Sequence, residues 1–351
     1  MKNYKIALIP GDGIGREVVP EGVRVLEAAG RRFGIGFQWD SFDWSCETYR
    51  RTGRMMPADG LEILKGYDAI FLGAVGAPGV PDHVSLWGLL IPIRRHFRQY
   101  ACVRPVRLYP GLASPLRDQI ARNIDFVIVR ENNEGEYSEI GGRLYQGTDE
   151  ELAVQESVFT RKGVDRILRY AFELARTRRQ HVTSATKSNG IIHTMPYWDE
   201  RFAAVARDYP DVRTDQYHID ILSAHFVLHP DRFDVVVASN LFGDILSDLG
   251  AAVAGSIGIA PSANINPERE YPSMFEPVHG SAPDIAGQGI ANPVAQILSG
   301  AMMLDHLGHA DAARAIEAAV ETALRDARLH TPDMGGRART VELGSAIAEA
   351  L

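Results

Sequence analysis

Cysteine is nearly absent from this sequence: Cys46 and Cys102 are the only two among 351 residues. Two cysteines are too few for a disulfide framework or for a zinc site built on thiolates, so they favour a reducing compartment. Long apolar runs are missing as well. No stretch approaches the roughly 20 residues that a membrane-spanning helix needs, and the N-terminus, MKNYKIALIPGDG, has no apolar signal segment. We therefore expect a cytoplasmic protein with no membrane partner.

An excess of positive charge is also missing. Lys and Arg number 37 against 45 Asp and Glu, which gives a formal net charge of -8. A broad nucleic-acid surface would need a basic face to neutralise phosphates, so we do not expect a nucleic acid as partner. An anionic substrate would have to be bound by a local cluster of Arg and Lys. The hydrophobic fraction of 45% is typical of a globular chain, and 351 residues suffice for one large domain or two lobes.

The apolar residues that are present alternate between short runs and amphipathic stretches, which is typical of an α/β protein. Paired glycines in the polar stretch 137–155, Gly141 and Gly142, suggest a hairpin or protruding arm. Four apolar runs predict buried strands, at 6–9, 69–72, 126–129 and 235–238. Two sets of residues at helical spacing predict amphipathic helices: Ile14, Val18, Val25 and Ala29 in one, and Val164, Ile167, Leu168, Ala171 and Ala175 in the other.

One glycine-rich turn resembles a dinucleotide-binding motif without completing it. Gly11, Gly13 and Gly15 follow the first predicted strand and open a helix. The fingerprint needs a third small residue three places after the second glycine, where helix and strand pack closely, and Arg16 stands there. The segment therefore predicts a tight strand-to-helix turn, and we do not expect a Rossmann fold.

Two carboxylates in the segment SNLFGDILSDLG, residues 239–250, suggest a metal site. Asp244 and Asp248 are four residues apart, so on a helix they project from one face and repel each other unless a cation lies between them. Oxygen ligands without a nearby cysteine favour Mg2+ or Mn2+ over zinc. Asp220, in the mostly apolar segment 219–227, is a third candidate. The alternative is that Asp244 caps the helix and Asp248 is a solvated charge.

Several arginines are candidates for binding an anion. Arg94 and Arg104 lie near each other in the sequence, and Arg130 ends a predicted strand, where α/β folds place ligand contacts. Guanidinium groups bind carboxylates in bidentate fashion. The alternative is a solvated helix face, which we favour for the neighbouring Arg95 and Arg98.

Two further residues are candidates for proton transfer. Lys187 follows a predicted strand in a run of small polar residues, an unusual setting for a solubilising lysine. A divalent cation and arginines nearby would favour its neutral form, which suits a general base. Tyr137 lies in RENNEGEY, a run that is too polar for core packing.

Long segments in order along the chain carry a family resemblance. They are DHVSLWGLLIPIRR, RENNEGEYS, SATKSNG, HIDIL, SNLFGDILSDLG and FEPVHGSAPDIAGQGIANP. Together with IPGDGIG near the N-terminus and TPDMGG near the C-terminus, they resemble the β-decarboxylating dehydrogenases, the isocitrate and isopropylmalate dehydrogenase family. Within it, DHVSLWGLL and MPYWDER are most similar to the tartrate and D-malate branch.

This resemblance implies a two-lobed α/β fold, isopropylmalate dehydrogenase-like and not a Rossmann fold. One lobe, residues 1–98 and 255–351, would bind the cofactor. The other, residues 99–254, would provide dimerisation and metal binding, with an arm around 137–155 protruding from it. The resemblance also implies a homodimer whose active sites are shared between the two chains.

The resemblance assigns substrate binding to five residues. Arg94, Arg104 and Arg130 match the arginines that hold the carboxylates of a malate-like acid, and Ser85 and Trp87 match positions in the substrate wall. We expect Trp87 to fill the space that a branched side chain would occupy.

It assigns proton transfer and metal binding to five more. Lys187 matches a lysine of the partner chain that takes the hydroxyl proton, and Tyr137 matches a tyrosine that protonates carbon after decarboxylation. Asp244 and Asp248 match metal ligands of one chain, and Asp220 matches the ligand that the partner donates.

A segment near residue 280 is similar to the adenosine-binding loop that replaces a dinucleotide fingerprint in this family. Asp284 there would accept hydrogen bonds from both ribose hydroxyls and repel a 2′-phosphate, so it favours NAD over NADP. Its alternative reading is a loop or helix-capping aspartate. The implied cofactors are NAD and Mn2+ or Mg2+, with K+ as a further candidate. The implied cofactor-binding residues are His279, Gly280, Ser281, Ala282, Asp284, Ile285 and Asn292.

The implied reaction is NAD- and metal-dependent oxidation of a small 2-hydroxy dicarboxylic acid. It covers tartrate oxidation, oxidative decarboxylation of D-malate to pyruvate and CO2, and decarboxylation of meso-tartrate. One alternative is a 3-isopropylmalate dehydrogenase, and another is a non-catalytic regulatory subunit. Regulatory relatives usually lack metal or proton-transfer residues, and every one is present here. Cys102 departs from the family, which usually has asparagine at this position, so we expect it to affect turnover or substrate preference.

Overall fold

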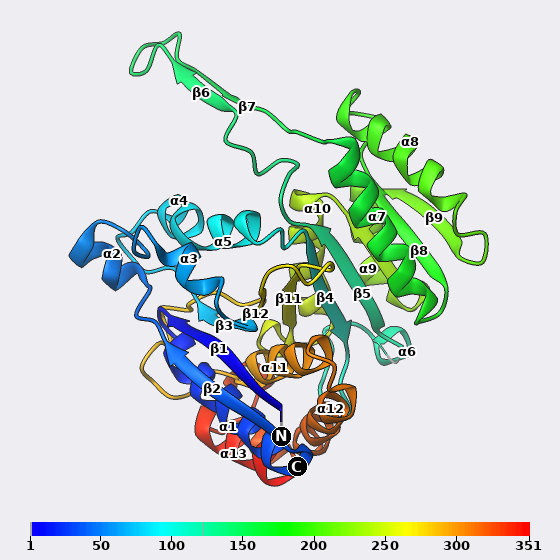
Figure 1. Ribbon diagram of the computed structural model, residues 1–351. Helices are drawn as coiled ribbons and strands as arrows, with labels where there is room; N and C mark the ends of the chain where they lie inside the picture. Colours follow the sequence, from blue (N-terminus) through cyan, green and yellow to red (C-terminus); the bar gives the residue numbers. More distant parts are fainter. Residues whose placement is uncertain (1, 122) are drawn as a thin grey trace.

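The computed structural model describes residues 2–121 and 123–351 of the chain. Its centre is one ten-stranded sheet in the order β2-β1-β3-β12-β11-β4-β5-β10-β8-β9, and helices pack on both faces of it (Figure 1). The expected α/β fold is confirmed. The strands of the sheet are β1 (Lys2–Gly11), β2 (Ile35–Ser41), β3 (Ala69–Ala74), β4 (Ala101–Arg107), β5 (Asp125–Glu131), β8 (His181–Thr186), β9 (Arg213–His218), β10 (Val235–Ala238), β11 (Pro261–Ile265) and β12 (Ser273–Pro277).

The four predicted strands lie within β1, β3, β5 and β10, and the two predicted helices are α1 and α7. The apolar residues that predicted each helix are buried. Thr160 caps α7 by accepting the amide of Gly163. The helices are α1 (Gly15–Phe33), α2 (Cys46–Thr52), α3 (Gly60–Leu64), α4 (Asp82–Ser85), α5 (Ile91–His96), α6 (Asp118–Ala121), α7 (Arg161–Arg176), α8 (Thr194–Ala206), α9 (Ile219–Leu228), α10 (Asn240–Val253), α11 (Val294–His306), α12 (Ala310–Leu324) and α13 (Thr340–Glu349).

Short helical turns complete the secondary structure. A π-helical turn, η1 (Leu86–Leu90), joins α4 to α5, and 3-10 turns follow α9, α10 and α12. These 3-10 turns are η2 (Pro230–Arg232), η3 (Ile257–Ile259), η4 (Ala327–Leu329) and η5 (Pro332–Met334).

The sheet changes direction in its middle. Strands β2, β1, β3 and β12 are mutually parallel, as are β5, β10, β8 and β9, while β11 and β4 pair antiparallel with each other and with their outer neighbours. Strands from 2–74 and 261–277 thus form one side of the sheet, and strands from 101–238 form the other. The division into two lobes at residues 98 and 255 stays a prediction.

The predicted hairpin is present. Strands β6 (Gly141–Leu144) and β7 (Leu152–Gln155) pair antiparallel outside the main sheet, and they extend away from the rest of the molecule (Figure 1). Side chains on both strands, including Leu144 and Val154, are exposed in the single chain.

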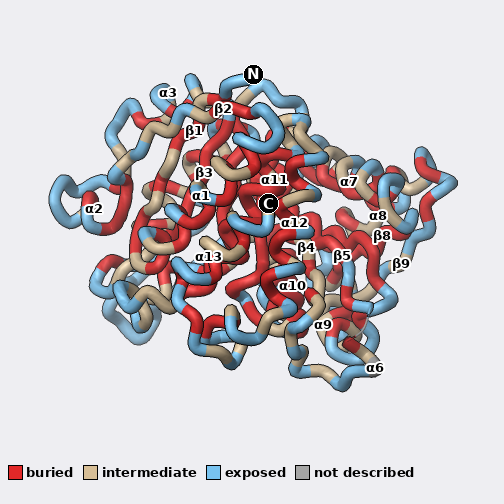
Figure 2. The backbone as a smooth tube through the Cα atoms, turned by 90° about the horizontal axis from the view of Figure 1, so that it is seen from below, coloured by how far each residue is buried: buried red, intermediate tan, exposed pale blue. Residues whose placement is uncertain are grey.

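The core is continuous through the central strands and α11, as the buried part of the tube in Figure 2 shows. Ten of the thirteen residues of α11 are buried, because this helix packs on α1, α12, β11 and β12. Within the two described ranges, none of the helices has the length and apolar character needed to cross a membrane.

The glycine-rich turn is the tight connection that the sequence predicts, since β1 ends at Gly11 and α1 begins at Gly15. Gly13 has φ of 53°, and a Cβ there would lie 2.0 Å from the carbonyl oxygen of Ser281. The amide of Ile14 donates to that same oxygen at 2.9 Å. The glycine is therefore needed for contact with the loop around residue 281.

Candidate active site

The two antiparallel strands in the middle of the sheet have one polar and one apolar face. Because side chains alternate along a strand, Cys102 and Arg104 of β4 point to one face and Val103 and Pro105 to the other. Ser262 of β11 lies beside the first pair, 3.5 Å from the Cys102 Sγ and 3.4 Å from the Arg104 Nε. The register of these two strands therefore places Cys102, Arg104 and Ser262 together on one face.

A cavity of about 180 Å³ lies on the polar face. Five of the residues predicted for substrate binding, proton transfer or metal binding line it, together with His279 and Gly280 of the predicted cofactor loop. The five are Arg94, Arg104, Arg130, Tyr137 and Asp244. The three arginines are buried, with 2–7% of each exposed. They come from α5, β4 and β5, so tertiary structure brings three distant cationic groups to one small volume.

Asp244 connects most of these groups. Its Oδ1 accepts hydrogen bonds from Arg104 Nη1, at 3.2 Å, and from Arg130 Nη1, and its Oδ2 accepts the Tyr137 hydroxyl at 2.9 Å. Burial opposes ionisation of Asp244, but Arg130 and Arg104 outweigh it and hold the pKa of this carboxyl below its ordinary value. Asp244 is the fifth residue of α10, whose N-cap is Ser239, so the capping alternative is wrong.

Tyr137 is half-buried beside this carboxylate. Burial, and then the negative charge of Asp244, raise the pKa of the phenol above its ordinary value. The hydroxyl therefore stays protonated at neutral pH, as a proton donor must. The loop that carries it is tied to α5, where Arg95 Nη2 donates to the Tyr137 carbonyl at 2.6 Å.

Sequence reasoning missed Glu276, a buried residue of β12 that also lines the cavity. Its Oε1 accepts Arg94 Nη2 at 2.6 Å and Asn264 Nδ2 at 2.7 Å. Among the described residues the Nε of Arg94 has no partner, which leaves that donor for a ligand. An acidic residue inside the apolar strand SMFEP was the available signal, because a buried carboxylate needs a cationic partner.

Lys187 and Asp220 form a second group. Lys187 directly follows β8, as predicted, and its Nζ lies 3.1 Å from Asp220 Oδ2 on α9. The hydrogen bond from Lys187 lowers the pKa of Asp220. Neither residue lines the cavity of the arginines. The structure of one chain therefore divides the predicted site residues into two separate groups.

The predicted metal ligands fit a divalent cation in chemistry but not within one chain. Asp244 and Asp248 lie one turn apart on α10, where their oxygen atoms suit Mg2+ or Mn2+. Asp220 stays with Lys187. Over residues 2–121 and 123–351, no group of three His, Cys, Asp or Glu side chains converges on a possible metal position.

The loop of residues 279–292 is fastened to the start of α1. Glu17 accepts the amides of Gly287 and Gly289 at 2.6 and 2.8 Å, and Ala282 and Ile285 pack near Ile14, the N-cap residue of α1. These contacts hold the loop, which was predicted to bind adenosine, against the connection between β1 and α1.

Within that loop, some of the predicted cofactor-binding side chains have hydrogen-bonding groups without a partner, and others are already bonded within the protein. His279 and Gly280 line the cavity, and burial lowers the pKa of His279. His279 Nε2 is buried without a partner in the part of the chain described, so a bound group can satisfy it. Asp284 is exposed. Asn292 instead donates to Asp333 and accepts the amide of Val294.

Neither of the two predicted substrate-wall residues lines the cavity in the single chain. Ser85 Oγ donates to the Asp82 carbonyl at 3.0 Å, and the Trp87 ring lies under the Arg95 guanidinium at 4.9 Å. Leu86 and Leu90 of η1 line the cavity in their place. Sequence reasoning chose the large aromatic residue and missed these leucines, because helical phase decides which side chains point inward.

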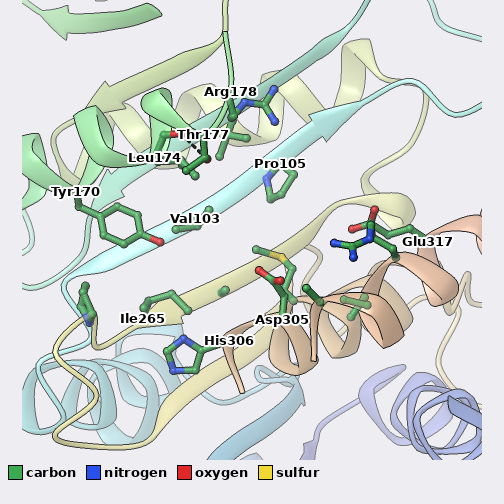
Figure 3. Close-up of a pocket in the computed structure, with 18 of the residues that line it drawn as sticks. Val103, Pro105, Tyr170, Leu174, Thr177, Arg178, Ile265, Asp305, His306 and Glu317 are labelled. Atoms are coloured by element: carbon green, nitrogen blue, oxygen red, sulfur yellow. Dashed lines mark hydrogen bonds between the residues drawn. The ribbon is translucent and has the colours of Figure 1, made fainter. Parts of the chain in front are cut away.

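The opposite, apolar face of the central strands carries a larger groove of about 520 Å³. Figure 3 shows Val103, Pro105 and Ile265 on its floor, with Tyr170 of α7 and His306 of α11 at its sides. It contains none of the predicted site residues. The smaller cavity, with its converging arginines, is therefore the candidate active site.

Comparisons with known proteins identify the family and the fold. A family model described as isocitrate/isopropylmalate dehydrogenase matches residues 5–348. The chain is 59% identical to the D-malate dehydrogenase [decarboxylating] of Escherichia coli (strain K12), covering 99% of both chains. It is also 59% identical to the tartrate dehydrogenase/decarboxylase of Pseudomonas putida, covering 99% of this chain and 98% of that one. The crystal structure of isocitrate dehydrogenase from Methylococcus capsulatus superimposes with a TM-score of 0.89 at 39% identity, covering 99% of both.

Proposed function

This chain belongs to the isocitrate/isopropylmalate dehydrogenase family of oxidoreductases, and we propose that it oxidises tartrate and decarboxylates D-malate oxidatively, with NAD and a divalent metal. Decarboxylation of meso-tartrate is a further reaction of the same site. The observation that carries the proposal is the convergence of Arg94, Arg104 and Arg130 on a cavity of about 180 Å³, which suits a small acid with two carboxylates.

The arginines bind and orient the substrate. A carboxylate that enters the cavity takes hydrogen bonds from their free N–H groups, and burial strengthens each of these bonds. Leu86 and Leu90 exclude water from one side of the substrate. Bound Mg2+ or Mn2+ supplies Lewis-acid chemistry at the 2-oxygen, and NAD supplies the hydride acceptor.

The proton transfers are assigned to two side chains. Lys187 of the partner subunit removes the hydroxyl proton as hydride leaves C2. The resulting 2-keto acid loses CO2 from the adjacent carbon. Tyr137, which the structure keeps protonated, then gives a proton to that carbon to yield pyruvate from D-malate. With tartrate the reaction ends at oxidation, except that meso-tartrate undergoes a decarboxylation that is redox-neutral overall.

A homodimer is proposed because large apolar side chains are exposed near both groups of site residues. Ile191, Ile192, Ile221, Leu228 and Ile245 are large apolar residues with 42–68% of each exposed. Three of them lie within four residues of Lys187, Asp220 or Asp244 in the sequence. An isologous contact over this surface would cover it and would bring Lys187 and Asp220 of one subunit to Asp244 and Asp248 of the other.

The cofactor proposal places NAD along residues 279–285, with its adenosine at Asp284. The unsatisfied His279 Nε2 and the exposed Asp284 carboxylate support it. The side chain of Asn292 is already bonded to Asp333 and to the start of α11, so we assign it to support of the loop.

A substrate panel tests the proposed function. With NAD+, Mn2+ and K+, D-malate and at least one tartrate isomer should give a kcat/KM about tenfold or more above that of 3-isopropylmalate, since a mismatched pocket contact costs that much. NADH and CO2 should be followed separately, because tartrate oxidation releases NADH alone. A preference for 3-isopropylmalate would contradict the proposal and would indicate that Leu86 and Leu90 form a pocket for a branched side chain. No turnover of any acid would favour a regulatory subunit.

A further inference from the structure

Asn240, the first residue of α10, holds the guanidinium of Arg130. Its Oδ1 accepts both Arg130 Nε, at 3.1 Å, and Arg130 Nη2, at 2.7 Å. Nε and Nη2 lie on one edge of the planar guanidinium, so a single oxygen occupies that whole edge. The amide of Asn240 is fixed in turn, because its Nδ2 donates to the Glu134 carbonyl at 3.1 Å.

Gly243, one turn further along α10, gives Arg130 its space. A Cβ at Gly243 would lie 2.6 Å from both Cβ and Cγ of Arg130, closer than packed side chains approach. The stem of the arginine therefore lies directly against the backbone of the helix. Asn240 and Gly243 together determine where the guanidinium lies and how it is turned.

We propose that this first turn of α10 is a positioning device that presents the Nη1–Nη2 edge of Arg130 to the substrate. With the Nε–Nη2 edge taken by Asn240 and one Nη1–H donated to Asp244, the N–H groups left to a carboxylate are one on Nη1 and one on Nη2. Asn240 is a positioning residue, since it acts through Arg130. The inference rests on the proposed function, in which Arg130 binds a substrate carboxylate.

The competing explanation is that Asn240 only satisfies a buried polar group. Arg130 is 2% exposed and Asn240 is 3% exposed, and any buried guanidinium needs acceptors. A purely structural role would change stability in every background. A positioning role would change substrate binding only while residue 130 is an arginine.

A double-mutant cycle separates the two roles. Asn240→Ala should raise the KM for D-malate about tenfold or more, as expected for a lost hydrogen bond to a charged group, and leave the KM for NAD within about twofold. The ammonium group of a lysine has no planar edge like the one that Asn240 binds in Arg130, so Asn240 cannot orient it. In an Arg130→Lys background, Asn240→Ala should therefore change the KM for D-malate by less than about twofold.

Gly243→Ala is an independent test that does not depend on removing a polar group. Alanine favours a helix interior more than glycine does, yet its methyl group would push Arg130 out of place, so the KM for D-malate should rise here too. Asn266→Ala is the matched control. Asn266 is equally buried, but its side chain donates to the Arg98 carbonyl and to Glu268 and accepts the amides of 270 and 271, so its loss should lower Tm alone.

The outcomes distinguish the inference from its premise. If Arg130→Lys leaves the KM for D-malate unchanged, Arg130 does not bind substrate and the proposed function is wrong at this residue. If Arg130→Lys raises that KM, but Asn240→Ala and Gly243→Ala do not, the inference alone is wrong. An effect of Asn240→Ala of equal size in both backgrounds also overturns it.

Discussion

At the scale of single residues, Cys102 is the side chain that we expect to distinguish this site. It is fully buried on β4 and lies on the same face as Arg104. Both side chains approach Ser262, whose hydroxyl is 3.5 Å from Sγ and 3.4 Å from the Arg104 Nε. A thiol is a weak hydrogen-bonding group, so Cys102 competes little with Arg104 for the Ser262 hydroxyl.

We predict that Cys102→Asn alters catalysis without unfolding the protein. An asparagine can compete for Ser262 and shift Arg104, so the ratio of kcat/KM for tartrate to that for D-malate should change by about threefold or more, the equivalent of one modest hydrogen bond. Steady-state assays of both acids measure it. Cys46→Ala serves as the control, because Cys46 is equally buried in α2, outside the cavity. Identical ratios in wild type and Cys102→Asn would make Cys102 a bystander.

At the scale of elements, the loop of residues 279–292 and helix α1 act as one unit. Glu17 accepts two loop amides, and Gly13 lets the turn approach Ser281. A loop held at both points can present Asp284 at a defined position with little loss of conformational freedom on binding. The sequence could not predict this contact, because Glu17 and the loop glycines that it binds are about 270 residues apart.

We predict that Asp284 sets the preference for NAD. Its carboxylate would repel a 2′-phosphate and accept ribose hydroxyls, so Asp284→Ala should shift the NAD+/NADP+ ratio of kcat/KM toward NADP+ by about tenfold or more. Asp326→Ala is a control for charge, since it removes one negative charge from a half-buried site outside the loop, where Asp326 pairs with Arg328. An unchanged ratio in Asp284→Ala would show that adenosine binds elsewhere.

At the scale of the whole molecule, the separation of the two site groups is the main finding. Arg130, Tyr137 and Asp244 share one cavity, while Lys187 and Asp220 pair 3.1 Å apart outside it. A single chain therefore holds an anion-binding half without its proposed base. The proposed homodimer with shared active sites would supply this base from the partner chain, and the proposal predicts how mixed dimers behave.

Complementation between two inactive variants tests that prediction. Arg130→Ala removes a substrate contact and Lys187→Met removes the proton acceptor, so each homodimer should be nearly inactive. In a heterodimer one site carries both lesions, and the other pairs an intact Arg130 with an intact Lys187. Random mixing makes half of the dimers mixed, each with one intact site, so about a quarter of wild-type activity should return.

The measurement is activity after co-expression or after unfolding and refolding of the mixture. Wild-type protein taken through the same treatment controls for recovery, and differently tagged chains verify the heterodimer. Verified heterodimers without activity would place Lys187 and Arg130 in the same site within one chain.

Much of the local structure could be predicted from the sequence, because its causes are local. The apolar runs of β1, β3, β5 and β10 and the helical faces of α1 and α7 lie where their periodicity predicts. Spacing alone indicated that Asp244 and Asp248 share a face of α10. The low number of cysteines argued against a disulfide-rich protein, and the acidic net charge argued against a broad nucleic-acid surface, before any element was assigned.

The tertiary structure decided which side chains meet. The register of β4 with β11 places Cys102 and Arg104 beside Ser262 and leaves Val103 and Pro105 for the opposite groove. Helical phase placed Leu86 and Leu90, and not Trp87, at the cavity. A strand's pattern of alternation is contained in its own residues. The strand that pairs with it, and in which register, depends on the packing of the whole chain.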